Sequence, residues 1–189
     1  MLIASKLLAQ GHGLAPVLLK RASSVELDWD VRQKSRFECT DSSGRRLGVF
    51  LPRGAVARGG DVLVAEDGSL VKVLAAPQPV LVIRPCPEDG SLSDLARAAY
   101  HLGNRHVPVE LKPDHLKIEP DHVLADMLRA MHLIVTEQSA AFEPEGGAYA
   151  SSQGAGSAHD HHQRDHEGHA HHGPDHDHHG HDHEGHGHQ

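Results

Sequence analysis

The last forty residues of the chain contain almost nothing that could form a hydrophobic core. Apart from Pro174, residues 150–189 include no apolar residue larger than alanine, and histidine, glycine, aspartate and glutamate predominate. Ordering one residue of backbone costs about 1–2 kcal/mol, which burial of such small side chains does not offset. The sequence therefore predicts that folding is confined to residues 1–149 and that residues 150–189 are a disordered His-rich tail.

Residues 1–76 have the pattern of a small all-β domain. Short runs of strand-forming residues alternate with turns rich in glycine and aspartate. The predicted strands are Ser24–Trp29, Phe37–Thr40, Arg46–Phe50, Asp61–Ala65 and Leu70–Leu74. Pro77 and Pro79 lack the amide hydrogen that strand pairing needs, so we expect pairing to stop in residues 75–79 and a domain boundary to follow residue 76.

Residues 77–149 change to alternating strands and helices. Ser91 and Asp121 are the expected N-caps of two amphipathic helices, and Gly103 is expected to end the first. The six elements are expected at residues 80–83, 91–103, 107–111, 115–118, 121–131 and 133–136. This βαββαβ order is that of ferredoxin-like domains. The predicted fold class is α+β, with the β domain first, a ferredoxin-like domain second and the tail last.

Charge and composition exclude several classes of partner. Residues 151–189 carry one arginine against seven acidic residues, and the whole chain has a formal net charge of -8. Such an acidic chain is a poor ligand for phosphate backbones, so no nucleic acid is expected. No run approaches the roughly 18 apolar residues of a membrane span, and residues 1–20 show no leader cleavage site. Cys39 and Cys86 are expected to be reduced thiols of a soluble cytoplasmic protein.

The tail holds 14 of the 20 histidines. Neutral imidazole suits nickel, copper and zinc, and the neighbouring acids lower the electrostatic cost of gathering divalent cations. We therefore expect the tail to bind several metal ions, with zinc or copper competing in vitro; the plainer interpretation is a solvated low-complexity end. The predicted tail ligands are His159, His161, His162, His166, His169, His171, His172, His176, His178, His179, His181, His183, His186 and His188.

Three segments carry a resemblance to a known family. They read YHLGNRHVPVE at residues 100–110, DHVLADML at residues 121–128 and FEPEGGAY at residues 142–149. Together with the His-rich terminus, they closely resemble the UreE family, the urease nickel metallochaperones. The resemblance implies a protein that is not an enzyme, that binds Ni(II), and that delivers it to apo-urease during assembly of the urease metallocentre.

The resemblance also implies a site and partners. His106, at the end of the GNRH motif, would meet its symmetry mate at a nickel site shared across a homodimer of ferredoxin-like domains. His122 matches a position of accessory metal sites, but the second histidine of that pattern is replaced by Pro120, so His122 is either an accessory ligand or a surface residue; His115 lies nearby. The expected partners are the urease apoprotein complex and the accessory GTPase UreG, with the β domain docking partners or peptides.

Two other functions remain open at this stage. A general nickel, zinc or copper buffer or storage protein would need only the tail. An enzyme would need Asn104, Arg105 and His106 to act as an anion-binding and acid–base cluster, but no paired nucleophile and base is evident.

Overall fold

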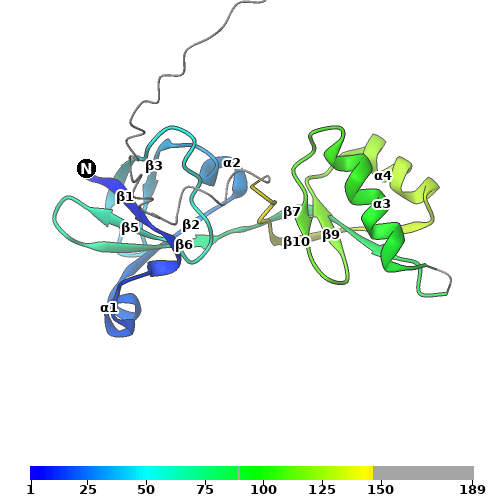
Figure 1. Ribbon diagram of the computed structural model, residues 1–189. Coiled ribbons are helices and arrows are strands. Elements are labelled where there is room, and N and C mark those ends of the chain that lie inside the picture. The colour runs from blue at the N-terminus through cyan, green and yellow to red at the C-terminus, as the bar shows by residue number, and fades with distance from the viewer. Residues whose placement is uncertain (89, 147–189) are drawn as a thin grey trace, which may run out of the picture. The chain divides into compact units, whose positions relative to one another are not determined.

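The computed structural model describes residues 1–88 and 90–146, and Met1–Ser151 forms one compact unit. This part of the chain is a mixed α+β protein with two sheets and a few short helices (Figure 1), so the predicted α+β class is confirmed. The predicted tail at residues 150–189 lies outside the described residues. None of the described helices is long and apolar enough to span a membrane.

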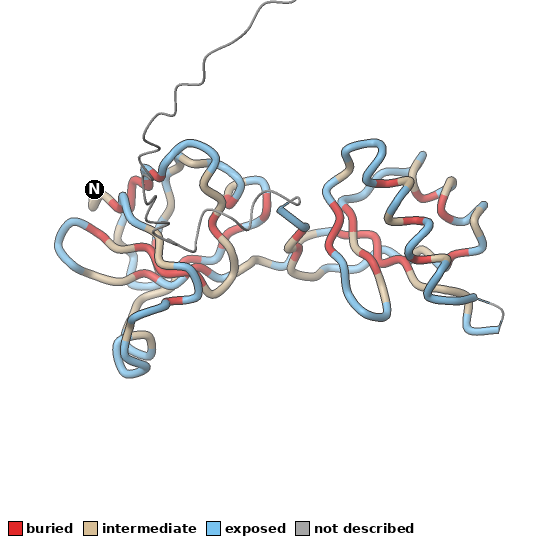
Figure 2. Tube along the Cα trace, in the orientation of Figure 1, coloured by how far each residue is buried: buried red, intermediate tan, exposed pale blue. Residues whose placement is uncertain are grey.

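The first sheet has six strands. In order across the sheet they are β2 (Ser23–Leu27), β6 (Leu70–Ala75), β5 (Val62–Ala65), β1 (Leu2–Leu8), β4 (Arg46–Phe50) and β3 (Arg36–Thr40). The five predicted strands are present, and β1 is an additional strand that was not predicted. Most of the buried hydrophobic residues of these strands belong to one core cluster, and Figure 2 shows in red where the chain is buried.

Three short helical segments accompany this sheet. They are the 3₁₀ helix η1 (Ala9–Gly11), α1 (Pro16–Arg21) and α2 (Trp29–Arg32). The predicted strand Ser24–Trp29 is wrong at its end, because the Asp28 carboxylate accepts a hydrogen bond from the Val31 amide (2.9 Å) and caps α2. Trp29 is therefore a helical residue, and it is buried.

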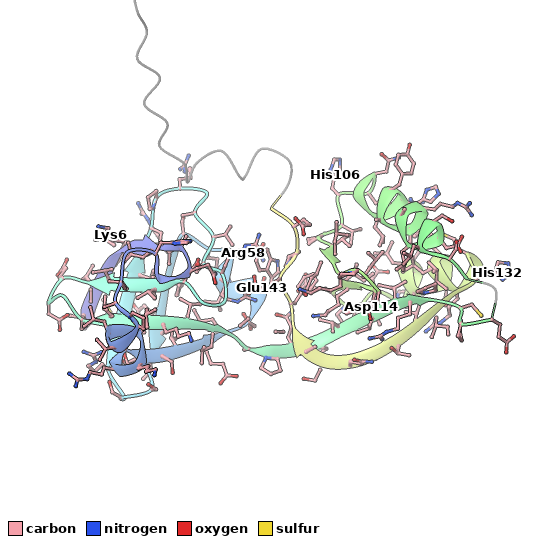
Figure 3. The ribbon with its side chains drawn as sticks, turned by 60° about the horizontal axis from the view of Figure 1, so that its bottom comes forward. Lys6, Arg58, His106, Asp114, His132 and Glu143 are labelled. Carbon is pink, nitrogen blue, oxygen red and sulfur yellow. The ribbon has the colours of Figure 1, made fainter. Side chains whose placement is uncertain are left out.

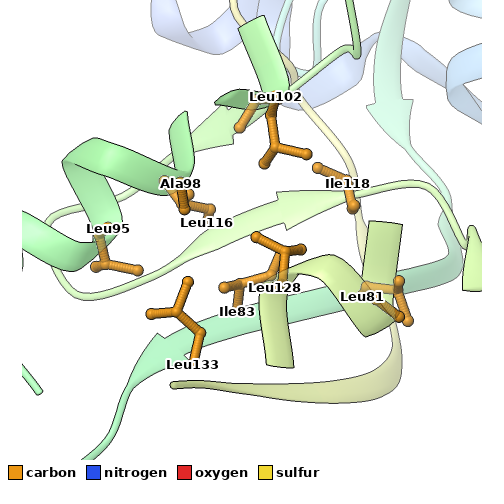
Figure 4. Packing of buried hydrophobic residues seen from close by; sticks show 11 residues of the cluster. Leu81, Ile83, Leu95, Ala98, Leu102, Leu116, Ile118, Leu128 and Leu133 are labelled. Atoms are coloured by element: carbon orange, nitrogen blue, oxygen red, sulfur yellow. The ribbon is translucent and has the colours of Figure 1, made fainter. Parts of the chain in front are cut away.

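The second sheet has four strands with two helices packed on it. Its order is β10 (Leu133–Ala141), β7 (Pro77–Pro85), β9 (Leu116–Ile118) and β8 (Glu110–Leu111), all antiparallel. The helices are α3 (Leu92–Gly103) and α4 (His122–Ala130). Leu95, Ala98 and Leu102 of α3 and Leu128 of α4 pack with buried residues of the sheet in a single cluster (Figure 4).

Two sequence expectations for this half are wrong in detail. Strand pairing does not stop at residues 75–79, since Pro77 and Pro79 belong to β7 and face Ala141 and Ser139 of β10. Strand β9 reaches only Leu81, so the prolines have a strand neighbour on one side only, where a missing amide hydrogen is tolerated. The strand expected at residues 107–111 is only Glu110–Leu111, because the chain first leaves α3 through a tight turn and Pro108.

Asp41 organises the turn between β3 and β4. Its carboxylate is buried and accepts hydrogen bonds from the Ser23 hydroxyl (2.8 Å), the Ser43 hydroxyl (2.7 Å) and the Arg45 amide (2.9 Å). Burial alone would raise the pKa of Asp41, but these donors and the Arg45 guanidinium outweigh it and hold the pKa well below its usual range. The turn therefore depends on an ionised Asp41.

Asp41→Asn should lower the free energy of unfolding at pH 7 by about 2 kcal/mol, because charge-assisted hydrogen bonds are lost. A carboxyl whose pKa is depressed by folding stabilises the fold fully above its unfolded pKa of about 3.9 and loses this as pH falls further. The difference between the two chains should therefore shrink between pH 4 and pH 3 in urea unfolding followed by circular dichroism. Asp30→Asn, at an exposed carboxylate, is the control, and a difference independent of pH would contradict the assignment.

Candidate metal site

His106 lies in the turn that ends helix α3. The helix starts at Ser91, whose amide donates to the Asp94 carboxylate (2.8 Å) as the capping-box spacing predicts. At the other end, the His106 amide donates to the Gly103 carbonyl (2.9 Å) and the Val107 amide donates to the Leu102 carbonyl (3.1 Å). This pair of bonds is a Schellman motif, in which His106 occupies the left-handed position with φ of 56°.

The backbone conformation of His106 is uncommon for a residue other than glycine, and His132, in the turn after α4, shares it with φ of 60°. The left-handed position of a Schellman motif favours glycine, because a Cβ atom is crowded there. Glycine is nonetheless absent, and the imidazole of His106 is carried on an exposed residue at the helix end (Figure 3). The turn therefore presents an exposed imidazole at the end of α3, as the turn of His132 does at the end of α4.

The side chains before His106 are engaged with the helix itself. The Arg105 guanidinium donates to the His101 carbonyl (3.0 Å), satisfying one of the unpaired carbonyls in the last turn. The Tyr100 ring lies edge-on to the His101 ring, with 5.5 Å between ring centroids, and Tyr100 is 66% exposed. In this arrangement Arg105 acts as a C-terminal cap, which is not the anion-binding role that the enzyme hypothesis needs.

On its other side, the His106 turn is fixed by the segment that follows β10. The Val109 carbonyl accepts a hydrogen bond from the Glu145 amide (2.9 Å). The buried Glu110 carboxylate accepts from the Glu143 amide (2.7 Å) and from the ammonium groups of Lys117 (3.0 Å) and Lys112 (3.1 Å). Burial alone would raise the pKa of Glu110, but these donors lower it overall, so Glu110 serves as an ionised anchor.

The side chain of Glu143 contacts the part of the chain that carries the six-stranded sheet. It accepts from the Arg32 guanidinium (2.7 Å), the Gly59 amide (2.9 Å) and the Arg58 guanidinium (3.3 Å). Arg32 has no exposed surface, and it also donates to the carbonyls of Phe142 (2.6 Å) and Leu27 (3.0 Å). Burial lowers the pKa of Arg32, while the charge of Glu143 opposes this effect. Arg58 and Glu143 lie next to each other in Figure 3.

Trp29 completes this cluster. The guanidinium carbons of Arg32 and Arg58 lie 5.4 Å and 5.0 Å from the centre of the Trp29 ring, and Phe142 meets that ring edge-on at 6.2 Å. Sequence reasoning missed these residues. Glu143 lies within a noted motif, but nothing in the sequence links it to Arg32, which is 111 positions away.

The structure does not bring the other predicted ligands to His106. His122 is the exposed first residue of α4 and lines an open cleft with Asp121, Arg129 and Glu137. His115 bonds through Nδ1 to the Asp114 carboxylate (2.8 Å), which lowers the pKa of Asp114. Among residues 1–88 and 90–146, no three His, Cys, Asp or Glu side chains are grouped to hold a metal ion. The fourteen tail histidines lie outside the described residues.

Comparison with known proteins covers both halves of the chain. The model of the UreE urease accessory protein N-terminal domain matches residues 4–76, and that of the C-terminal domain matches residues 78–189. The urease accessory protein UreE of Paracidovorax citrulli is 80% identical over 151 residues, covering 80% of this chain and 72% of the relative. That of Albidiferax ferrireducens is 76% identical over 161 residues, covering 85% and 91%. That of Verminephrobacter eiseniae is 68% identical over 168 residues, covering 86% and 100%.

Strain at His106 makes a testable stability prediction. His106→Val should lower the free energy of unfolding by about 1–2 kcal/mol, since a β-branched residue fits the left-handed position poorly. His106→Gly should leave it unchanged or raise it by up to about 1 kcal/mol. Urea unfolding measures both. The same pair of substitutions at His122, a first-turn helical residue, is the control, and a His106→Gly chain less stable than His106→Val would contradict the assignment.

Proposed function

The chain belongs to the UreE urease accessory protein family, and from that premise we propose that it is a nickel metallochaperone. It binds Ni(II) as cargo and delivers it to apo-urease during assembly of the urease metallocentre, and it is not an enzyme. The observation that carries the proposal is that the GNRH segment, which lies within the stretch matched by the C-terminal domain model, ends in the exposed imidazole of His106.

His106 suits a site that must release its metal. One imidazole supplies one ligand, so a second copy of the chain is needed to give a two-histidine site with further positions open to exchange. We propose that this copy joins through a ferredoxin-like domain at residues 77–149. The βαββαβ element order and the strand order β10-β7-β9-β8 support that assignment. Leu92, Tyr100 and Val123 support the interface, because each is an apolar side chain more than 60% exposed on α3 or α4.

The His-rich tail, residues 150–189, is proposed to collect the metal. The last described segment is bonded to Val109 through Glu145, and Val109 is three positions from His106. His159, the first tail histidine, is fourteen residues beyond Glu145, and fourteen residues span at most about 50 Å. The connecting chain therefore keeps the tail imidazoles near His106, and this raises their effective concentration at that site.

The proposed partners are the urease apoprotein complex and the accessory GTPase UreG, with docking by the β domain, residues 1–76, in the cytoplasm. The chain has no G-x-x-x-x-G-K-[ST] motif of its own, so nucleotide hydrolysis is assigned to the partner. A general nickel, zinc or copper buffer is the second candidate. It is favoured only by the composition of the tail and gives no role to the exposed His106 of the GNRH segment.

Calorimetric nickel titration, combined with light scattering, separates the two candidates. A chain ending at Ser151, which keeps the whole compact unit, should be dimeric and bind about one tight nickel ion per pair of chains. His106→Ala in that chain should abolish this binding, while His12→Ala is the matched control and should not. Loss of all tight binding on truncation would instead make the tail the carrier and favour the buffer.

Nickel binding by the shortened chain should weaken as pH falls. Histidine ordinarily titrates near pH 6.5, and protons compete with metal for the ring nitrogens. With two imidazole ligands, the affinity at pH 5.5 should be about a hundredfold below that at pH 7.5, as measured by the same titration. Affinity that stays constant over this range would contradict imidazole ligation.

A further inference from the structure

The side chain and the backbone amide of Glu143 make hydrogen bonds to two different parts of the chain. Its carboxylate contacts Arg32, Arg58 and Gly59, which belong to the part of the chain that carries the six-stranded sheet. Its backbone amide donates to the Glu110 carboxylate, four positions beyond His106. Within the unit Met1–Ser151, Glu143 therefore links the part that carries the six-stranded sheet to the part that carries the four-stranded sheet through direct hydrogen bonds.

The carboxylate contacts are strongly determined. Arg32 is fully buried, so its guanidinium needs compensating charge and acceptors, and Glu143 is the carboxylate that supplies the charge. Arg58 adds a second donation to Glu143 and donates to the Pro144 carbonyl (2.5 Å). Moving Glu143 would leave a buried cation without its counter-ion, so the position of this residue follows the position of Arg32.

The amide contact is equally determined on the other side. Glu110 is 3% exposed, and its carboxylate is already shared by Lys112 and Lys117, so the Glu143 amide completes a buried cluster. Residues 107–109 join this cluster to the Schellman turn, and the Val109 carbonyl is held by Glu145. The segment that follows the His106 turn is therefore held by the buried Glu110 cluster, to which the Glu143 amide belongs.

We propose that Glu143 is a positioning residue that couples the Arg32 and Arg58 contacts to the nickel-binding turn. This inference rests on the proposed nickel function of His106 and deepens it. When nickel holds His106, the turn and its anchor are stabilised, and the bond from the Gly59 amide to Glu143 opens less often. By linkage, contacts that hold Glu143 increase the affinity of His106 for nickel by the same factor. A partner that binds near Arg58 or Gly59 therefore changes nickel affinity without touching the metal.

Hydrogen exchange of the Gly59 amide reports this coupling directly. Coupling energies carried through packed networks correspond to effects of about threefold or more. Saturating the full chain with nickel should slow Gly59 exchange by about that factor, as measured by mass spectrometry with residue-level fragmentation. The His106→Ala chain, which keeps the whole tail, should show no nickel effect at Gly59.

Titration of two charge-neutralising variants gives the reciprocal measurement. Glu143→Gln keeps the backbone amide and the size of the side chain but removes the charge opposite Arg32. It should weaken His106-dependent nickel binding by about the same threefold or more. Glu38→Gln, which removes the carboxylate of an exposed pair with Arg46 (2.9 Å), is the matched control and should leave nickel affinity unchanged.

The outcomes separate the two proposals. Slower Gly59 exchange that requires His106, with weaker binding only in Glu143→Gln, supports the coupling. Nickel binding that depends on His106 but leaves Gly59 exchange unchanged overturns the coupling and leaves the nickel function standing. A chain in which no nickel binding depends on His106 overturns both. Because the exchange experiment uses the unmodified chain, the test holds even if Glu143→Gln folds poorly.

Discussion

The buried guanidinium of Arg32 is the constraint on which much of the described chain depends. Removing such a charge from water costs several kcal/mol unless it is paired and fully hydrogen-bonded. Leu27, Phe142 and Glu143 provide this compensation, and Trp29 offers the face of its ring. Two of these groups come from the segment after the last strand, so the chain has to return to Arg32 after β10.

That return explains the order found around His106. Because Phe142 and Glu143 are fixed by Arg32, the amides of Glu143 and Glu145 reach Glu110 and Val109 in a defined register. Glu110 and Val109 in turn end the segment that begins at the Schellman turn of α3. A residue with φ of 56° can be kept at position 106 because bonds on both sides over-determine the backbone there.

The local features of this architecture follow from the sequence, and the long-range ones do not. The caps at Ser91 and Asp121 are encoded within three or four residues, and both are present. GNRH identified His106 by resemblance, but its left-handed backbone has no local signal, since glycine is the residue that predicts such a turn. The pairing of Arg32 with Glu143 joins positions 111 residues apart, where neither periodicity nor turn chemistry carries information.

The predictions failed at the prolines and at Trp29 for different physical reasons. Pro77 and Pro79 were expected to end pairing because a proline lacks a donor, yet only one side of β7 is paired at that point. Trp29 has a side chain typical of strands, but Asp28 caps a helix and the buried Arg32 needs its ring nearby. Tertiary context decided the outcome at the prolines, whereas at Trp29 a local cap outweighed the strand preference of the side chain. Tertiary context also supports the backbone around His106 through Glu110 and Glu145, and in the proposed function a pair of such imidazoles leaves ligand positions of the metal ion open to exchange, unlike a closed site.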